Sequence, residues 1–339
     1  TSASQSHEKK QNKYSFKRNI FKSYKFSINL FLYNLKVLDC LIKNKIDIVH
    51  AHDLFNLPVA GIYSLLFRKK FIYDSHELER HRNAEFSLIF NFVRNAAESF
   101  FINKAYRVIT VSESYSDYLN NFYKLKSKPI VTFNSPKIRN NKSLKNLRSD
   151  LSIPDSTRIL VYVGLITKNR GLEKVLYAIK NIPNMVFVTV GPCNNLRHLE
   201  KLKEIREENN LINKVFFLDP VSPSEVVSYI SSADASILPV QNVCLSYYFC
   251  MPNKLFESTF AGLPLIVSKL KDMNDFISEY KCGLSVDINN QLDLSKKIEE
   301  VLNNKNKYKL TQKLFSLIKS KYSWEVQEKK IIDLYKEIA

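Results

Sequence analysis

MPNKLFESTFAGLPLIVS, residues 251 to 268, combines the pattern of a short helix with that of a buried strand. Pro252 suits the first turn of a helix, where a missing N–H leaves no bond unmade. Asn253 and Glu257 lie four residues apart and share one helical face, and Gly262 is expected to end the helix before a strand at 264–268. The residues of the buried face recur at helical spacing: Leu255, Phe256, Thr259 and Phe260.

The N-terminus of such a helix offers free N–H groups and a partial positive charge, which suit a diphosphate. Glu257, about one turn further in, could accept hydrogen bonds from a ribose. Periodicity alone favours a simpler interpretation, in which Glu257 is a solvated residue of an ordinary helix that leads into a strand.

Short β-branched runs alternate with helical patterns along the chain, which predicts an α/β protein with parallel sheets covered by helices. Strands are expected at 46–50, 71–74, 107–111 and 130–133, and again at 158–164, 185–191, 214–218, 235–238 and 263–268. A polar passage rich in lysine and asparagine separates the two sets. We therefore expect a first domain at 1–140, a linker at 141–157, a second domain at 158–321 and a C-terminal helix at 322–339.

Charge is concentrated in the first half of the chain, where residues 1 to 150 carry 26 Lys and Arg against 12 Asp and Glu. Nucleic acid is not the expected partner, because no zinc spacing, helix-turn-helix or RNP-like pattern accompanies the charge. An anionic membrane surface fits better, since lysines border an apolar stretch at residues 26–41: Lys22, Lys25, Lys36, Lys43 and Lys45. A core-packed surface helix with a solvated lysine face explains this pattern equally well. The five cysteines are scattered and predict neither a disulfide framework nor a zinc site.

Residues 251–268 resemble the donor-binding signature of family 4 glycosyltransferases, in the variant that reads P-N-K-L-F-E followed by G-x-P. The resemblance implies the GT-B fold, in which two Rossmann-like domains face each other across a cleft. It also implies a retaining, metal-independent enzyme that moves a sugar from a nucleoside-diphosphate sugar by front-face attack of an acceptor hydroxyl. With the basic first half, we expect a glycan or lipid-linked acceptor and a cytoplasmic enzyme peripheral to the inner face of the cell membrane.

The resemblance extends to GLITKNRGL, residues 164–172, which is similar to the family's phosphate loop. Gly164 opens the loop, and Arg170 stands where a basic residue meets the diphosphate and can clamp two phosphate oxygens. Leu165 replaces a second basic residue of the family, so Lys254 is the nearest substitute. Gly191 resembles the turn beside the nucleotide base.

One departure concerns the two glutamates of the family signature. Glu257 matches the second glutamate, whereas Phe249 occupies the place of the first, which contacts the donor sugar. Ser246 and Asn253 are candidate polar substitutes.

Two histidine-bearing motifs follow predicted strands of the first domain: HAHD at residues 50–53 and YDSHE at 73–77. His76 resembles the family's active-site histidine, which reaches the transferred sugar, and His50, His52 and Asp53 resemble an acceptor-side loop. The same four residues could in principle ligate zinc, but their alternation along a strand end would point them to opposite faces. His81 and His198 are expected on the surface. No D-x-D motif occurs, so no metal is expected at the diphosphate.

The family's opening strand, glycine-rich loop and helix have no counterpart before residue 46, and Gly61 is the only glycine among residues 1–150. We therefore expect an N-terminally incomplete copy or one whose opening unit has been lost. A non-catalytic relic or nucleotide-sugar-binding module is the first alternative function. A nucleotide-sugar isomerase on the same fold is the second, although it would need paired acid and base groups around one sugar.

Overall fold

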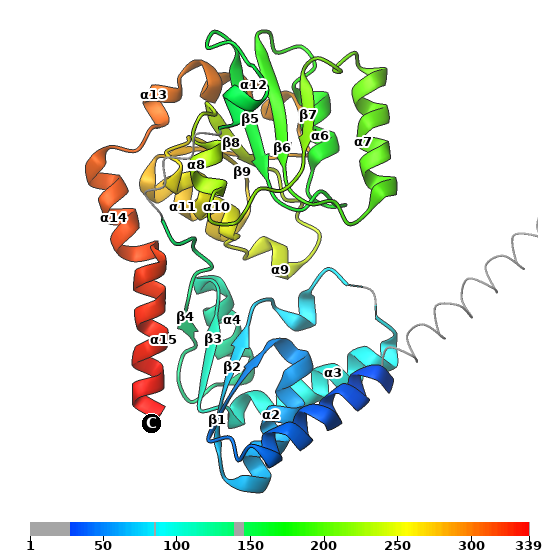
Figure 1. Ribbon diagram of the computed structural model, residues 1–339, viewed down its shortest axis with the longest axis vertical. Coiled ribbons are helices and arrows are strands. Elements are labelled where there is room, and N and C mark those ends of the chain that lie inside the picture. The colour runs from blue at the N-terminus through cyan, green and yellow to red at the C-terminus, as the bar shows by residue number, and fades with distance from the viewer. Residues whose placement is uncertain (1–27, 85, 139–145, 339) are drawn as a thin grey trace, which may run out of the picture. The chain divides into compact units, whose positions relative to one another are not determined.

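The computed structural model describes residues 28–84, 86–138 and 146–338. They form two compact α/β units that divide between Val131 and Thr132 (Figure 1). This division lies before the predicted linker at 141–157, part of which forms the short helix α5 (Leu147–Asp150). Lys22 and Lys25 of the expected membrane-binding stretch lie outside the described residues, whereas residues 28–43 are helical.

The first unit has one parallel sheet of four strands in the order β1-β2-β3-β4. Its strands are β1 (Ile48–His52), β2 (Lys70–Ser75), β3 (Arg107–Thr110) and β4 (Ile130–Val131). Besides the helix at residues 28–43, its helices include α2 (Asp53–Phe67), α3 (Leu88–Phe101) and α4 (Glu113–Tyr123). Strand β1 begins later than expected and includes His52. The reason is that the preceding helix ends at Lys43 and is followed by a turn, in which Lys45 is left-handed and the Ile46 N–H bonds to the Leu41 carbonyl.

The second unit has a parallel sheet of six strands in the order β10-β9-β8-β5-β6-β7. Its strands are β5 (Arg158–Val163), β6 (Met185–Val190), β7 (Val215–Leu218), β8 (Ala235–Leu238), β9 (Leu265–Ser268) and β10 (Gly283–Val286). The helices that cover it include α6 (Leu172–Ala178), α7 (Leu196–Glu208), α8 (Val226–Ile230), α11 (Lys271–Tyr280) and α12 (Gln291–Asn303). Strand β10 was not predicted. A Cβ at Gly283 would lie 1.8 Å from the Leu265 carbonyl oxygen, so this edge strand requires the glycine that weakens its sequence signal.

Helix α10 (Asn253–Phe260) carries the signature residues, with Pro252 as its N-cap rather than within its first turn. The predicted buried face is confirmed, because Leu255, Phe256, Thr259 and Phe260 are all buried. The ring of Phe256 packs against Phe133 and Tyr322, with centroids 5.6 and 5.3 Å away. The donor-motif helix is therefore fixed from behind by an aromatic cluster within the second unit.

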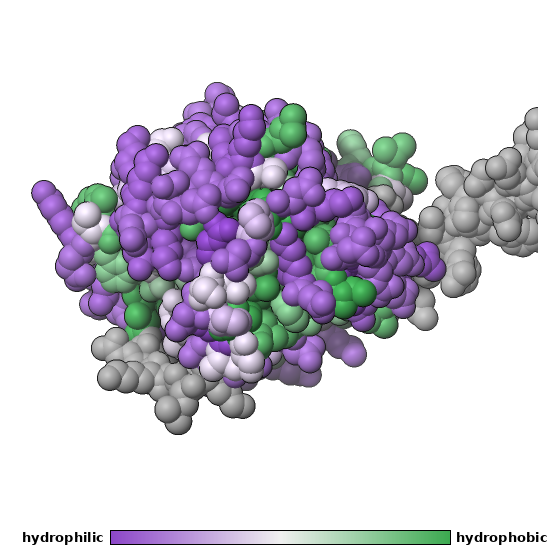
Figure 2. Space-filling view, turned by 90° about the horizontal axis from the view of Figure 1, so that it is seen from above, coloured by the Kyte–Doolittle hydropathy of each residue, from purple (hydrophilic) through white to green (hydrophobic). Residues whose placement is uncertain are grey.

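The chain ends in two helices, α14 (Gln312–Tyr322) and α15 (Trp324–Ile338), separated at Ser323. The side chain of Gln327 in α15 accepts a hydrogen bond from the Phe133 backbone N–H at 3.2 Å. The expected return of this tail to the first domain stays a prediction. Seen from above, the molecule presents mainly hydrophilic side chains, with smaller hydrophobic patches between them (Figure 2).

Candidate functional site

A cavity of about 250 Å³ lies at the carboxyl ends of β5 and β8. Strand β5 pairs with β6 on one side and β8 on the other, so this is the point where the strand order reverses and where open α/β sheets bind ligands. Five residues predicted for the donor site line it: Gly164, Arg170, Pro252, Asn253 and Lys254. Tyr162, Val163, Leu165, Leu238 and Val240 complete the lining.

Glycines let the backbone segments around this cavity approach one another closely. A Cβ at Gly191 would lie 2.0 Å from the Gly164 carbonyl oxygen, and one at Gly171 would lie 2.1 Å from the Pro239 carbonyl oxygen. Gly171 also has a φ of 71°, which favours glycine. Gly191 therefore packs against the backbone of Gly164 and does not line the cavity.

Arg170 supplies the cation of the cavity that has no acidic partner. Its guanidinium lies over the ring of Tyr247, 5.1 Å from the centroid, a stacking that holds the fork in place. Among the residues that the structure describes, no carboxylate forms an ion pair with it. Leu165, in place of the family's second basic residue, accepts a hydrogen bond from the Tyr162 hydroxyl at its backbone oxygen, 3.0 Å away.

Glu257 lies one turn into α10, is 6% exposed and does not line the cavity. Burial raises the pKa of its carboxyl group, while Lys254 acts in the opposite direction. The Lys254 Nζ is 3.3 Å from the Glu257 Oε2. The simpler interpretation of Glu257 as a solvated residue is therefore wrong, and its connection to the cavity runs through Lys254.

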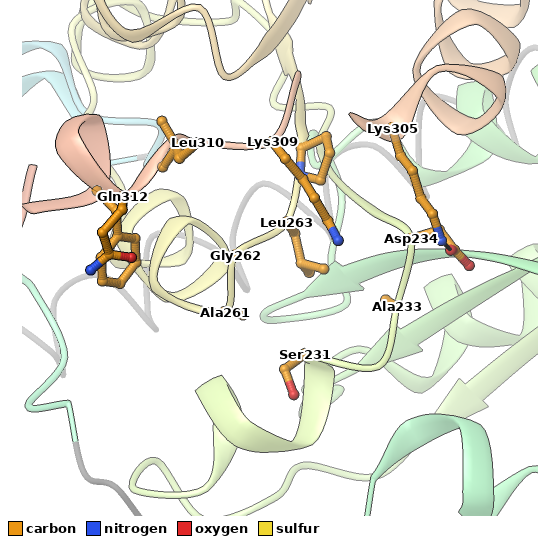
Figure 3. Close-up of a pocket in the computed structure, with 12 residues that line it drawn as sticks. Ser231, Ala233, Asp234, Ala261, Gly262, Leu263, Lys305, Lys309, Leu310 and Gln312 are labelled. Carbon is orange, nitrogen blue, oxygen red and sulfur yellow. Dashed lines mark hydrogen bonds and ion pairs between the residues drawn. The ribbon is translucent and has the colours of Figure 1, made fainter. Parts of the chain in front are cut away.

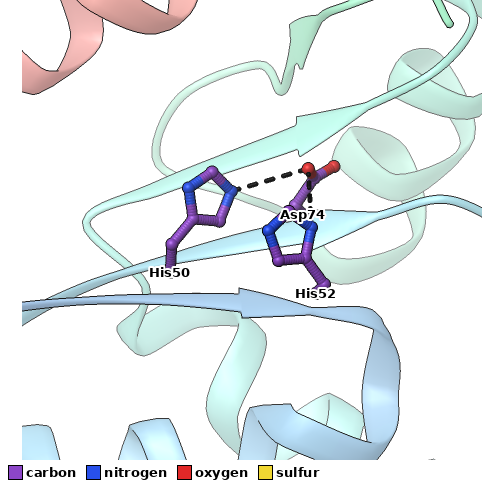
Figure 4. Close-up of side chains that lie close together, drawn as sticks. All are labelled: His50, His52 and Asp74. Carbon is purple, nitrogen blue, oxygen red and sulfur yellow. Dashed lines mark ion pairs between the residues drawn. The ribbon is translucent and has the colours of Figure 1, made fainter.

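Three histidines of the first unit surround one carboxylate, that of Asp74, and Figure 4 shows two of them, His50 and His52. From the Asp74 Oδ2, the His50 Nε2 is 3.5 Å away, the His52 Nδ1 3.2 Å and the His76 Nε2 3.4 Å. The rings of His50 and His52 are stacked at 4.5 Å. The parallel register pairs His52 with Asp74, and this brings the ends of β1 and β2 together.

The predicted placement of these residues needs two corrections. His50 and His52 lie two apart on one strand and share a face, so the expectation that they diverge is wrong. Asp53 leaves the strand instead, because it opens α2 with a φ of 58°, and its Oδ1 accepts a hydrogen bond from the His76 backbone N–H at 3.3 Å. Asp74, within the quoted YDSHE motif but not predicted as a site residue, takes the central position. The signal that could have identified Asp74 is its position two residues before His76, because residues two apart in extended backbone point to the same face.

The electrostatics of this cluster follow from the shared carboxylate. Burial opposes ionisation of Asp74, but hydrogen bonds and charge from His50 and His76 hold its pKa well below the usual range. The same hydrogen bond raises the pKa of His76. Burial lowers the pKa of His52.

His198 was expected on the surface, but it is buried because α7 packs against α6. Its Nδ1 lies 3.7 Å from the Glu173 Oε1. Burial lowers its pKa. His81 is partly exposed and contacts the Tyr118 hydroxyl at 2.7 Å. Neither lies in the two sites described above.

Another cavity of the second unit, about 380 Å³, lies at the opposite edge of the sheet (Figure 3). Asp234 and Pro264, which line it, come directly before β8 and β9, so it is at the amino ends of the strands. Asp234 is paired there with Lys305 at 2.5 Å and Arg148 at 3.0 Å. A carboxylate neutralised by two cations in this position serves the structure, and the cavity at β5 and β8 remains the candidate donor site.

Two α/β units with parallel sheets, and a cavity at the switch point of the second sheet, are typical of GT-B glycosyltransferases. The chain belongs to the group 1 glycosyl transferases, whose family model matches residues 144–314. The model of Glycosyltransferase Family 4 matches residues 2–134. The chain is thus a glycosyltransferase.

Named relatives and solved structures agree with this family. The D-inositol 3-phosphate glycosyltransferase of Corynebacterium urealyticum is 22% identical over 86% of this chain and 72% of its own. The alpha-monoglucosyldiacylglycerol synthase of Streptococcus pneumoniae is 24% identical, over 86% and 68%. Anabaena HepE, in complex with UDP and glucose, superposes with a TM-score of 0.71 at 15% identity, covering 90% of this chain and 81% of HepE.

Proposed function

We propose that this glycosyltransferase moves a sugar, with retention of anomeric configuration, from a nucleoside-diphosphate sugar to a hydroxyl of a lipid-linked surface glycan. The observation that carries the donor half of this proposal is Arg170, a cation at the switch point for which the described part of the chain offers no acidic partner. An uncompensated guanidinium in a cavity is stabilised by an anion, and its fork matches two phosphate oxygens. The UDP bound to the similarly folded HepE is an anion of this class.

Departure of the nucleoside diphosphate develops the largest charge in such a reaction. Arg170, the backbone N–H groups at the start of α10 and Lys254 surround the cavity in which we place this group. These donors are already in place, so they stabilise the developing charge without reorganisation. Because the cations come from the chain, we propose that the reaction needs no metal at the diphosphate.

The remaining assignments follow the family resemblance. His76 contacts the transferred sugar, and His50, His52 and Asp53 belong to the acceptor side. Glu257 accepts hydrogen bonds from the ribose. It does not line the cavity itself, so it reaches the ligand beside Lys254, which it contacts and which does line the cavity. Gly164 and Gly191 shape the loops around the diphosphate and the base.

We propose a lipid-linked acceptor because the first unit exposes large apolar side chains and the first half of the chain is rich in basic residues. Along α3, Leu88 is 88% exposed, Ile89 79% and Phe92 75%. Apolar side chains of this size would enter the headgroup region, and the basic residues of the first half of the chain would attract anionic lipids. Two relatives are named a D-inositol 3-phosphate glycosyltransferase and an alpha-monoglucosyldiacylglycerol synthase. Among the described residues, no helix combines the length and apolarity required to cross a bilayer.

The test begins with mass-spectrometric identification of a nucleotide that co-purifies with the protein. Hydrolysis of a panel of nucleoside-diphosphate sugars by the purified chain follows, with the anomeric configuration of the product read by NMR. Turnover with retention supports the proposal. Nucleotide binding without turnover of any donor would indicate a binding module instead, and epimerisation of the donor would indicate an isomerase.

A further inference from the structure

Three single atoms of the histidine cluster form a nearly equilateral triangle. The His52 Nδ1 and the His76 Nε2 are 3.2 Å apart, and they lie 3.2 and 3.4 Å from the same Asp74 Oδ2. The His50 Nε2 approaches that oxygen from a further direction, at 3.5 Å. All of these atoms belong to side chains at the carboxyl ends of β1 and β2.

Protons alone cannot satisfy this triangle. Each neutral imidazole carries one N–H, and an ionised carboxylate carries none. If each side of the triangle were a hydrogen bond, three protons would be needed, one along each side. At most two are available, one on the His52 Nδ1 and one on the His76 Nε2. If both point at the Asp74 oxygen, two N–H donors face each other across the 3.2 Å contact. A cation that accepts a lone pair from all three atoms removes this conflict.

We propose that His52, Asp74 and His76, with His50 beside them, bind a divalent transition-metal ion of the zinc type. In a tetrahedral site with metal-ligand distances of about 2.0 to 2.1 Å, neighbouring ligand atoms are about 3.3 to 3.4 Å apart. The sides of the triangle, 3.2 to 3.4 Å, match this separation. Imidazole and carboxylate ligands select zinc, cobalt, nickel or copper over magnesium, which prefers oxygen ligands alone.

The site has the other features of a functional metal centre. The His52 side chain is 57% exposed and that of His76 is 35% exposed, which gives an ion a path from solvent. The Asp74 side chain is only 13% exposed, so the charge it contributes is weakly screened. The His76 backbone is held by Asp53 through a hydrogen bond, which fixes the loop that carries this ligand.

Metal binding at this place inhibits sugar transfer, since it occupies the His76 nitrogen that would face the sugar. This consequence rests on the proposed function, whereas metal binding itself does not. A chelator would restore activity, so the inhibitory site is compatible with a donor site that works without metal.

The experiment titrates the full-length, chelator-treated protein with Zn²⁺ by calorimetry and with Co²⁺ by visible absorption, with Mg²⁺ as the control ion. The expected result is one equivalent of Zn²⁺ and the absorption bands of tetrahedral Co²⁺, with no response to Mg²⁺. His52→Gln should weaken Zn²⁺ binding by more than about 100-fold, since even changes behind the ligands weaken metal binding by about 10- to 100-fold. His81→Gln, a histidine outside the cluster, should bind Zn²⁺ as the wild type does.

Thermal unfolding without metal verifies that each variant is folded. If His52→Gln does not fold, His76→Gln is used in its place as the test variant. Donor turnover with and without Zn²⁺ is measured separately, so a protein that turns over no donor still reports on the metal site. Absence of Zn²⁺ binding to the wild type, or binding that survives in both folded variants, would overturn the proposal.

Discussion

Replacing Arg170 by alanine tests the donor site most directly, because this side chain faces the cavity and is bound to no acidic group among the described residues. Its removal takes away charge without leaving a buried carboxylate unpaired. The side chain is partly exposed and belongs to a loop, so the fold should persist. Any loss of donor binding can then be assigned to the missing guanidinium.

The size of the effect follows from the contacts that the fork can make. Two charge-assisted hydrogen bonds to phosphate contribute about 1.5 to 3 kcal/mol each. Lys254 and the N-terminus of α10 remain in the variant, so we take the lower bound, about 3 kcal/mol, which corresponds to a loss of about 10²-fold in kcat/KM. Arg170→Lys keeps the charge but loses the fork and the stacking on Tyr247, and it should lose about 10-fold.

The assay is donor hydrolysis or transfer over a range of donor concentrations, combined with calorimetric binding of the free nucleoside diphosphate. Arg197→Ala, which removes an exposed arginine of α7, is the matched control and should behave as the wild type. If Arg170→Ala kept kcat/KM within about threefold of the wild type while Arg197→Ala did the same, the diphosphate would not bind where we place it.

Four further results are expected. Glu257→Ala should abolish measurable donor binding or turnover without unfolding the protein, and wild-type turnover would remove Glu257 from the site. Activity should survive EDTA, and complete loss with recovery on manganese would contradict the metal-free donor site. Gly191→Ala should lower the free energy of unfolding by about 2 kcal/mol in urea titrations, because the added Cβ would lie 2.0 Å from a backbone oxygen. In the control Gly262→Ala the added Cβ meets no atom within 4 Å, so the free energy of unfolding should fall by less. The double variant Ile89→Ser with Phe92→Ser should sediment less with anionic liposomes. Unchanged sedimentation would show that α3 does not bind the membrane.

The fold was largely predictable because its information is local. Strands of a parallel sheet covered on both faces are short β-branched runs, and nine such runs are found within a few residues of their expected positions. The exception, β10, contains a glycine and a serine, and it depends on close packing against β9 that no local pattern reveals. Most of the lining of the candidate donor cavity comes from two continuous motifs, at 164–172 and 251–268, whereas Leu238 and Val240 come from another part of the sequence that no motif marked.

The histidine cluster was only half predictable, because strand register assembles it. His52 and Asp74 are 22 positions apart, and only the parallel pairing of β1 with β2 sets them side by side. A one-residue shift in register would have placed Asp74 on the other face of the sheet. Asp53 was assigned with His50 and His52 because the HAHD motif resembles an acceptor-side loop, but the left-handed turn at Asp53 directs its side chain to the backbone of His76.

The aromatic cluster behind α10 connects this helix to the residues that open the second unit. Phe133 is the second residue of that unit, and its ring packs directly on Phe256, the neighbour of Glu257. Its backbone N–H is tied to Gln327 of the terminal helix. A substitution at Phe133 is therefore expected to disturb two places at once: the packing behind α10 and the hydrogen bond that holds α15.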